Sequence, residues 1–438
     1  MQLSRSIRIL LFLPAVIVIG FFYFPLQLRG IPMNTKTILA GLGVLFICVE
    51  FFKGKGGVIR KDLLVLSVFA IIMSFICYLA ITLNNTSDNT YVTYIISMWV
   101  WLSAAYAAIY IVRGMYGKLT LQFLCDLLIA ACLIQCVSAL VIDMSVTVHD
   151  FVDRFVDHRW TESVNRFYGI SCELDTAGIH FAVMLVMIAY FLGSSSEKMS
   201  DWKIGFYWLS FIVITVIGNM IARTTLAGTG LGLAYLAWKT GVCQLRISGS
   251  QKRVLKIFAL IMVISLPVII YYYNTNDRIY ENIRFGFEGF FSLVEKGGWD
   301  VSSNNKLKTM VVFPENLKTW VIGDGYMINP KFDPYYIGPI TKGYYMDTDI
   351  GYLRFIFYCG LPGLIVFSLF ILKAGEVCAW RLPKYRVMVY VLVLLNFIVW
   401  MKVSTDLFFI FALLYSVDAV WEDEDDVPLH GKEMIIVE

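Results

Sequence analysis

The chain has 438 residues, of which 58% are hydrophobic and 16% are charged, and its formal net charge is +3 at pH 7. Soluble domains usually contain about 45–50% apolar and about 25% charged residues. This composition excludes a disordered chain, a fibrous repeat and an ordinary cytosolic enzyme, and it indicates a protein that crosses a membrane many times. The small net charge gives no reason to expect a nucleic-acid partner.

Twelve apolar runs follow one another along the chain. A helix that crosses the hydrocarbon core needs about 20 mainly apolar residues, so each run is a candidate span. In chain order the runs are 9–26, 37–52, 63–83, 91–112, 119–142, 175–192, 206–222, 224–238, 254–273, 350–372, 387–401 and 405–421. The sequence therefore predicts an all-α polytopic membrane protein with about 12 transmembrane helices, in a single membrane domain that covers residues 1–438.

Positive charge is distributed unevenly between the two sets of loops. The loops on one side contain many lysines and arginines, whereas the short loops on the other side contain only Arg29, Lys36, Arg223 and Lys402. Basic loops are retained in the cytoplasm. We therefore predict that both termini are cytoplasmic, and that the acidic tail at 422–438 lies there too.

Two long segments, 143–175 and 274–348, fall on the predicted outer side. Loops of this length are usually functional or disordered, and the many aromatic residues in 274–348 argue against disorder. The apolar pair at 293–294 and the run at 307–320 predict one or two amphipathic helices that lie on the outer face.

An arginine lies at the predicted outer mouth of the sixth span. Arg166 precedes Glu173 and Asp175, where this span begins. A guanidinium at this place can bind a diphosphate through parallel hydrogen bonds. The alternative is an interfacial arginine that pairs with a neighbouring carboxylate. His180, deeper in the same span, is expected to be a hydrogen-bonded packing residue.

A second arginine, Arg223, separates two apolar runs that have almost no loop between them. This places its side chain at or just under the outer surface, where an arginine can extend toward water without any further role. The tight turn, with Thr224 and Gly228 beside it, favours a binding site. Arg278 and Arg284 in the long outer segment are further candidates for phosphate contacts, although most charges there are expected to be solvated.

Two acids, Asp347 and Asp349, stand just before the tenth span. Carboxylates at the start of a helix can cap its N-terminus and interact with its dipole. Capping needs only one acid, so the other can take a proton from a hydroxyl as a general base. The isolated charges Asp126, Lys402, Asp406 and Asp418 are expected to form helix–helix pairs or to lie at an interface. The sequence has no metal-ligand spacing, so we expect no metal and no cofactor.

Four short motifs occur in a fixed order between residues 166 and 367. They are Arg166-Phe-Tyr-Gly169 with Glu173, then Ala222-Arg223-Thr224, then Val321-Ile-Gly323-Asp324-Gly325, then Asp349-Ile-Gly351-Tyr352-Leu-Arg354 with Gly360 and Gly363. In this order, and in its twelve-span layout, the chain resembles the Wzy-type O-antigen and capsular polysaccharide polymerases, together with the related O-antigen ligases.

The resemblance implies a GT-C-like glycosyltransferase of the bacterial cytoplasmic membrane, with its active site on the outer side. A hydroxyl of one repeat unit attacks the anomeric carbon of a growing glycan, and polyprenyl diphosphate leaves. The implied diphosphate-binding residues are Arg166, Arg223, Arg278 and Arg284, the implied catalytic acids are Asp349, Asp347 and Glu173, and the implied sugar-binding residues are Tyr344, Tyr345 and Trp320. The implied partners are the polyprenyl-diphosphate-linked oligosaccharide, membrane lipid and a chain-length-determining membrane protein.

The chain departs from the ligases at one place. The ligases have a histidine near the re-entering span, whereas this chain has no histidine between His180 and His430 and has acids at that place. This departure favours a polymerase and leaves open which acid is the base. The alternatives are a ligase-type glycan transferase and a lipid-linked oligosaccharide flippase or transporter. A transporter would be expected to show inverted repeats, and the sequence shows none.

Overall fold

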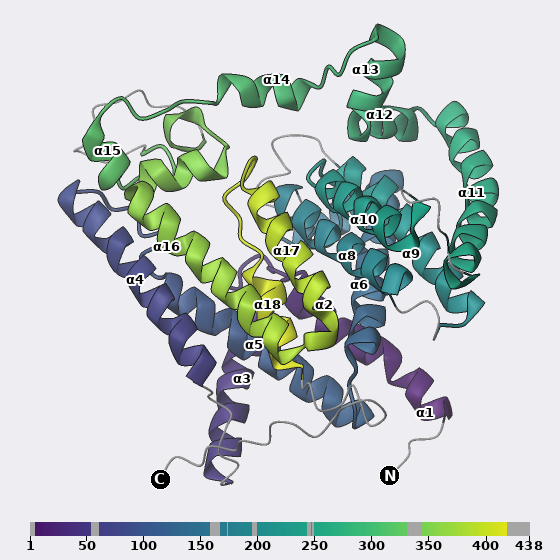
Figure 1. The fold of residues 1–438 in the computed structure, drawn as a ribbon, viewed down its shortest axis with the longest axis horizontal. Coiled ribbons are helices and arrows are strands. Elements are labelled where there is room, and N and C mark those ends of the chain that lie inside the picture. Colours follow the sequence, from purple (N-terminus) through teal and green to yellow (C-terminus); the bar gives the residue numbers. More distant parts are fainter. Residues whose placement is uncertain are drawn as a thin grey trace.

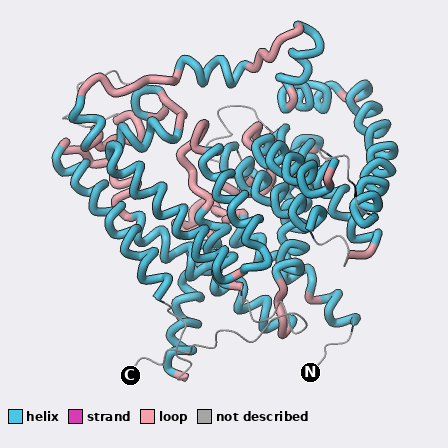
Figure 2. Tube along the Cα trace, viewed as in Figure 1, coloured by secondary structure: helices cyan, strands magenta, loops and turns pink. Residues whose placement is uncertain are grey.

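A computed structural model describes residues 5–53, 61–157, 167–172, 174–194, 199–242, 247, 249–330, 336 and 343–417. In these residues the protein is helical, and its β pairing is limited to three isolated bridges (Figure 2). Each of the twelve apolar runs predicted from the sequence contains a helix. The all-α fold class is therefore confirmed for this part of the chain.

The helices have the following bounds. The first seven are α1 (Arg5–Leu10), α2 (Phe12–Tyr23), α3 (Thr35–Phe52), α4 (Lys61–Leu83), α5 (Tyr94–Tyr116), α6 (Leu121–Met144) and α7 (Val146–Phe155). The next four are α8 (Leu174–Ser194), α9 (Asp201–Ile221), α10 (Thr225–Thr240) and α11 (Gly249–Thr275). Four short helices follow, α12 (Asp277–Gly286), α13 (Glu288–Lys296), α14 (Ser302–Thr309) and α15 (Leu317–Val321), and then α16 (Gly351–Arg381), α17 (Arg386–Val399) and α18 (Phe408–Ser416).

Nine helical stretches within the described ranges have the length and composition to cross a membrane. They are the joined α1–α2 and helices α3, α4, α5, α6, α8, α9, α11 and α16. The other predicted runs form α10, α17 and α18, which have 16, 14 and 9 residues. At 1.5 Å per residue even α10 is about 24 Å long, which is less than the hydrocarbon core of about 30 Å. The structure thus supports a polytopic membrane protein, and the count of twelve spans stays a prediction.

Helix α8 lies at the centre of the bundle, where 94% of its membrane span is buried. Small residues let α10 approach it closely. A Cβ atom at Gly228 would lie 2.3 Å from the backbone oxygen of Ala182, and one at Gly178 would lie 2.9 Å from the Cβ of Ala222. The two helices therefore meet backbone to backbone, as is common between membrane helices.

Helix α11 stands at the edge of the bundle, beside α9 (Figure 1). Only 6% of its apolar window is buried. Near its N-terminus the Phe258 ring lies 4.3 Å from the Trp208 ring, and Trp208 Nε1 donates a hydrogen bond to the Val254 carbonyl. Further along, Val263 and Ile264 are exposed. Such an apolar surface is suited to contact with lipid.

Helices α12–α15, which we call the cap helices, form a layer over one end of the bundle, at the top of Figure 1. The predicted amphipathic helix near 293–294 is α13. The run at 307–320 is not one helix, because α14 ends at Thr309 and α15 begins at Leu317. Pro314 lies between them, and a proline disfavours helical conformation in the residue before it.

Helix α16 returns from the cap helices into the bundle and is kinked near its start. Cys359 and Gly360 have non-helical dihedral angles, with Gly360 at φ +70° and ψ −178°. Pro362 follows two residues later. A glycine adopts this left-handed φ without a steric cost, so Gly360 allows the chain to kink here.

Candidate functional site

Arg223 lies in the turn that joins α9 to α10. Helix α9 ends at Ile221 and α10 begins at Thr225, and the Thr225 amide donates to the Ala222 carbonyl at 3.1 Å. Thr224 packs against Gly178 of the central helix α8. The turn is therefore held in place by α8, and it presents Arg223 to the cap helices.

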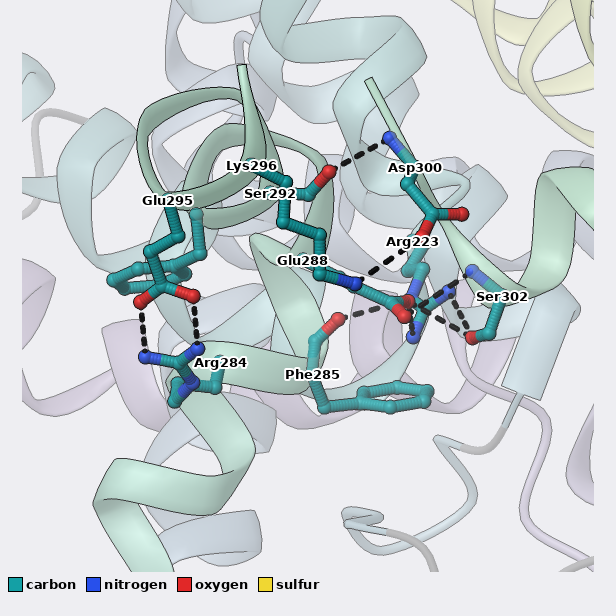
Figure 3. A pocket seen from close by; sticks show the side chains of 10 residues that line it. Arg223, Arg284, Phe285, Glu288, Ser292, Glu295, Lys296, Asp300 and Ser302 are labelled. Atoms are coloured by element: carbon teal, nitrogen blue, oxygen red, sulfur yellow. Dashed lines mark hydrogen bonds and ion pairs between the residues drawn. The ribbon is translucent and has the colours of Figure 1, made fainter. Parts of the chain in front are cut away.

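The guanidinium of Arg223 joins this turn to the cap helices (Figure 3). Its Nη2 atom forms an ion pair with Glu288 Oε2 at 2.8 Å, and its Nε donates to the Phe285 carbonyl at 2.9 Å. Its Nη1 donates to Ser303 Oγ at 2.9 Å, and its Cζ lies 4.0 Å from the centre of the Phe285 ring. Only 10% of the side chain is exposed. Arg223 is thus a nearly buried cation that pairs with the Glu288 carboxylate.

Glu288 is the first residue of α13, where a carboxylate interacts favourably with the helix dipole. Besides Arg223, it accepts hydrogen bonds from the Ser302 amide at 3.1 Å and the Ser302 hydroxyl at 2.9 Å. About a third of its side chain, 32%, is exposed. One carboxylate therefore connects α13, the start of α14 and the α9–α10 turn.

Two pockets flank the ion pair between Arg223 and Glu288. The first has a volume of about 330 Å³ and is polar, and it is lined by Arg223, Arg284, Phe285, Glu288, Phe291, Ser292, Glu295, Lys296, Asp300 and Ser302 (Figure 3). The second has a volume of about 230 Å³ and more apolar walls, and it is lined by Arg223, Leu226, Gly286, Phe287, Glu288, Gly289, Phe290, Trp299, Val301, Ser303, Asn304, Leu307 and Lys402. The second pocket combines two cations with aromatic walls.

Lys402 reaches this second pocket from the turn after α17. Its Nζ donates to Thr224 Oγ1 at 3.2 Å. The sequence predicted a helix–helix pair or an interface for this lysine, and the structure adds that it lines a pocket together with Arg223. One signal was available in the sequence, because Lys402 is one of only four basic residues in the short loops of the predicted outer side.

The same turn supports the start of α16. The Tyr352 amide donates to the Trp400 carbonyl at 3.3 Å, and a Cβ atom at Gly351 would lie 2.4 Å from the Val403 carbonyl oxygen. The acids Asp347 and Asp349 immediately precede this contact. The N-cap of α16 is Ile350, and no side chain caps the first turn. Neither acid therefore occupies the N-cap position of α16.

Arg278 and Arg284 of α12 both form ion pairs, Arg284 within the cap helices and Arg278 with Asp143 of α6. Arg284 donates two parallel hydrogen bonds of 2.7 Å to the Glu295 carboxylate, and these bonds lower the pKa of Glu295 below its usual value. Arg278 pairs with Asp143 at 3.2 Å, and 67% of its side chain is exposed. These contacts match the alternative of a solvated, ion-paired surface, and a role of either arginine in phosphate binding stays a prediction.

The Gly323-Asp324-Gly325 motif packs directly on the kink of α16. The Asp324 amide donates to the Phe357 carbonyl at 2.6 Å, and the Gly325 amide donates to the Tyr358 carbonyl at 3.1 Å. A Cβ atom at Gly323 would lie 2.5 Å from the Tyr358 carbonyl oxygen. Two motifs that are separate in the sequence are therefore one structural unit.

The three predicted sugar-binding aromatics lie around this unit. Trp320 donates from Nε1 to the Pro314 carbonyl and stacks on Phe313. Tyr345 contacts the Tyr326 ring at 5.3 Å and donates to Asp324. Tyr344 lies over the guanidinium of Arg354, at 3.3 Å. The structure brings these aromatics together at the start of α16, and it does not test whether they bind sugar.

Several predicted residues cannot be placed. Arg166, Glu173, Asp418 and the tail at 422–438 lie outside the described residues.

His180 is buried, its Nδ1 lies 2.6 Å from the Thr176 carbonyl oxygen, and its ring stacks on Phe409 at 4.1 Å. These are the contacts expected of a packing residue. Within the described ranges, no group of three or more His, Cys, Asp or Glu side chains could hold a metal ion.

Comparisons of the chain with protein-family models, with curated proteins and with solved structures found no match.

Proposed function

We propose that the protein is a glycosyltransferase of the bacterial cytoplasmic membrane, which joins polyprenyl-diphosphate-linked oligosaccharide repeat units into a polysaccharide on the outer side. One observation carries this proposal: Arg223 and Lys402, which come from two turns between apolar helices, line one pocket with aromatic walls beneath the cap helices. Two cations next to an apolar surface at the end of a membrane bundle suit a lipid diphosphate, because its headgroup is anionic and its chain is apolar.

Arg223 reaches the diphosphate by exchanging one anion for another. In the structure its donors are engaged by Glu288, Phe285 and Ser303. Glu288 is partly exposed, so its carboxylate can turn toward water while a phosphate oxygen takes its place. The exchange keeps the nearly buried guanidinium paired, which avoids the cost of an uncompensated charge.

The reaction needs a hydroxyl, a donor sugar and a base. The hydroxyl oxygen of one repeat unit forms a bond to the anomeric carbon of the donor, and the bond from that carbon to the diphosphate oxygen breaks. The electron pair leaves with the diphosphate, where Arg223 and Lys402 stabilise the developing charge. The hydroxyl proton goes to Asp349 or Asp347. Both acids stand just before α16, and the first turn of this helix packs on the turn that contains Lys402.

The test is chain extension by the purified full-length protein in lipid nanodiscs. The probe is the lipid-linked repeat unit extracted from cells that lack this protein. The wild-type protein should convert single units into long chains, and Arg223→Gln and Asp349→Asn should reduce the rate about a hundredfold or more. Transport of the unit across vesicles without any lengthening would refute the proposal, and transfer to a lipid A acceptor would favour a ligase.

A further inference from the structure

Arg354 is a buried cation in the first turns of α16. Only 7% of the residue is exposed. Its Nε donates to Met327 Sδ at 3.2 Å, and its face is covered by the Tyr344 ring at 3.3 Å. Among the described residues, no carboxylate lies within ion-pair distance of it. A sulfur atom and an aromatic ring are thus the contacts of a guanidinium that has five N–H donors.

Among the described residues, the Met327 sulfur is the hydrogen-bond acceptor that faces this guanidinium. Burial of an ionised group without an opposite charge is costly, and a thioether is a weak acceptor. Arg223 and Arg284, by contrast, each pair with a carboxylate, Glu288 and Glu295 respectively. The ring of Tyr344 fixes the plane of the Arg354 guanidinium, and the in-plane Nη donors are oriented to bind a carboxylate or a phosphate through two hydrogen bonds.

The surroundings of Arg354 are aromatic. Phe357 lies one turn further along α16, and its ring is 5.8 Å from the Tyr345 ring. Tyr345 in turn lies 5.3 Å from Tyr326 and 6.0 Å from Tyr336. Asp324 accepts a hydrogen bond from the Tyr345 hydroxyl. Flat rings with polar edges, together with a carboxylate, are suited to the apolar faces and the hydroxyl groups of sugars.

We propose that Arg354 is the anion-recognition residue of a sugar subsite, and that it binds the carboxylate of an acidic sugar in the glycan. The inference rests on the proposed function only in taking the ligand to be a glycan. A sugar carboxylate fits better than the lipid diphosphate, because Asp347 and Asp349 precede this helix and repel a multiply charged anion more strongly. The diphosphate has its own cations, Arg223 and Lys402, in a separate pocket.

A binding experiment tests this subsite without requiring catalysis. The full-length protein in phosphatidylcholine nanodiscs is titrated with tetragalacturonate, with neutral maltotetraose and with inorganic diphosphate, and intrinsic fluorescence is recorded. We expect the wild-type protein to bind tetragalacturonate, and Arg354→Gln to weaken that binding about tenfold or more. Arg354→Lys should recover only part of the affinity, since it keeps the charge and loses the planar fork.

Arg381→Gln is the matched control. Arg381 lies at the other end of α16, is also buried, and also covers a tyrosine ring, that of Tyr415 at 4.1 Å. Its substitution should leave tetragalacturonate binding unchanged. Thermal unfolding of each variant shows whether the fold is retained, and Arg354→Lys serves as the test if Arg354→Gln does not fold.

Three outcomes would overturn the inference: no binding of tetragalacturonate to the wild type, equal binding to the Arg354 variants, or a loss in those variants of diphosphate binding alone. Arg223→Gln separates this site from the proposed reaction, because it should weaken diphosphate binding and leave tetragalacturonate binding intact. A protein that binds tetragalacturonate through Arg354 but never lengthens a lipid-linked glycan would refute the proposed function and leave the subsite established.

Discussion

Glu288 Oε2 lies 2.8 Å from Arg223 Nη2, and this ion pair links the first residue of a cap helix to a turn between two membrane helices. Arg223 also donates to the Phe285 carbonyl and to the Ser303 hydroxyl, and Arg278 of α12 pairs with Asp143 of α6. Any anion that displaces Glu288 from Arg223 therefore acts on the position of α13 as well as on the arginine. If an anion binds at Arg223 as proposed, the loss of the Glu288 contact should also loosen the attachment of α13 to this turn.

Glu288→Gln should strengthen the binding of inorganic diphosphate several-fold, because the amide no longer competes with phosphate for Arg223. The same change should lower the free energy of unfolding by about 1–2 kcal/mol, because a nearly buried cation loses its counter-ion while Glu288 itself is partly exposed. Fluorescence titration and chemical unfolding measure the two effects. Glu376→Gln is the control, since Glu376 pairs with Lys373 on an exposed helix face. An unchanged affinity for diphosphate would argue against the anion exchange.

Lys402→Gln should raise the KM for the lipid-linked repeat unit about tenfold, because one of the two cations in the second pocket is removed. The rate at saturating substrate should fall less than in Arg223→Gln, since Arg223 still faces the leaving group. Chain-extension kinetics in nanodiscs give both parameters. Lys373→Gln removes a lysine from the exposed pair with Glu376 and should behave like the wild type. If both lysine variants behave alike, Lys402 has no role in binding.

Gly323→Ala should destabilise the contact between the loop after α15 and helix α16. Gly323 has φ +83°, and a Cβ atom there would lie 2.5 Å from a backbone oxygen. Left-handed strain and overlap with the backbone together should cost about 2–4 kcal/mol. Gly298→Ala, in the same outer segment but with no atom within 4 Å of the added Cβ, should be nearly neutral. Limited proteolysis of the cap helices and thermal unfolding distinguish the two, and equal behaviour would contradict this packing.

The ion pair between Arg284 and Glu295 predicts a pH dependence. Hydrogen bonds from Arg284 lower the pKa of Glu295 in the folded protein. The carboxylate therefore contributes stability above its unfolded-state pKa, and this contribution disappears as the pH falls through the lowered folded-state pKa. Wild-type protein should have a higher Tm than Glu295→Gln at pH 7, and the difference should vanish in strong acid. A difference that persists unchanged at pH 2 would contradict this assignment.

Periodicity and spacing predicted the helices well, since an apolar run of twenty residues has few other solutions. They also predicted that Arg223 lies in a tight turn between two apolar helices, and the structure has it between the end of α9 and the start of α10. The break between α14 and α15 could have been predicted from Pro314. Whether α10 crosses the membrane stays a prediction, because this Gly-rich helix has only 16 residues and packs closely against α8.

The partners of these residues could not be predicted. Lys402 is 178 positions from Thr224, and their hydrogen bond depends on how α17 and α10 are placed against α8. Glu288 is one of several acids in the outer segment, and no pattern marks it as the partner of Arg223. Arg354 was part of a motif, but its burial under Tyr344 depends on the fold of the segment before α16.

The contact between Gly360 and the backbone of Val321 has a consequence for protein engineering. Two main chains that touch without intervening side chains cannot be adjusted separately by repacking. A segment 274–348 taken from another protein should therefore be transplanted together with the α16 kink. Chimeras joined between Val321 and Gly360 should fail to fold. Chimeras joined after Pro362 should fold, because they take the new segment together with the α16 kink on which it packs.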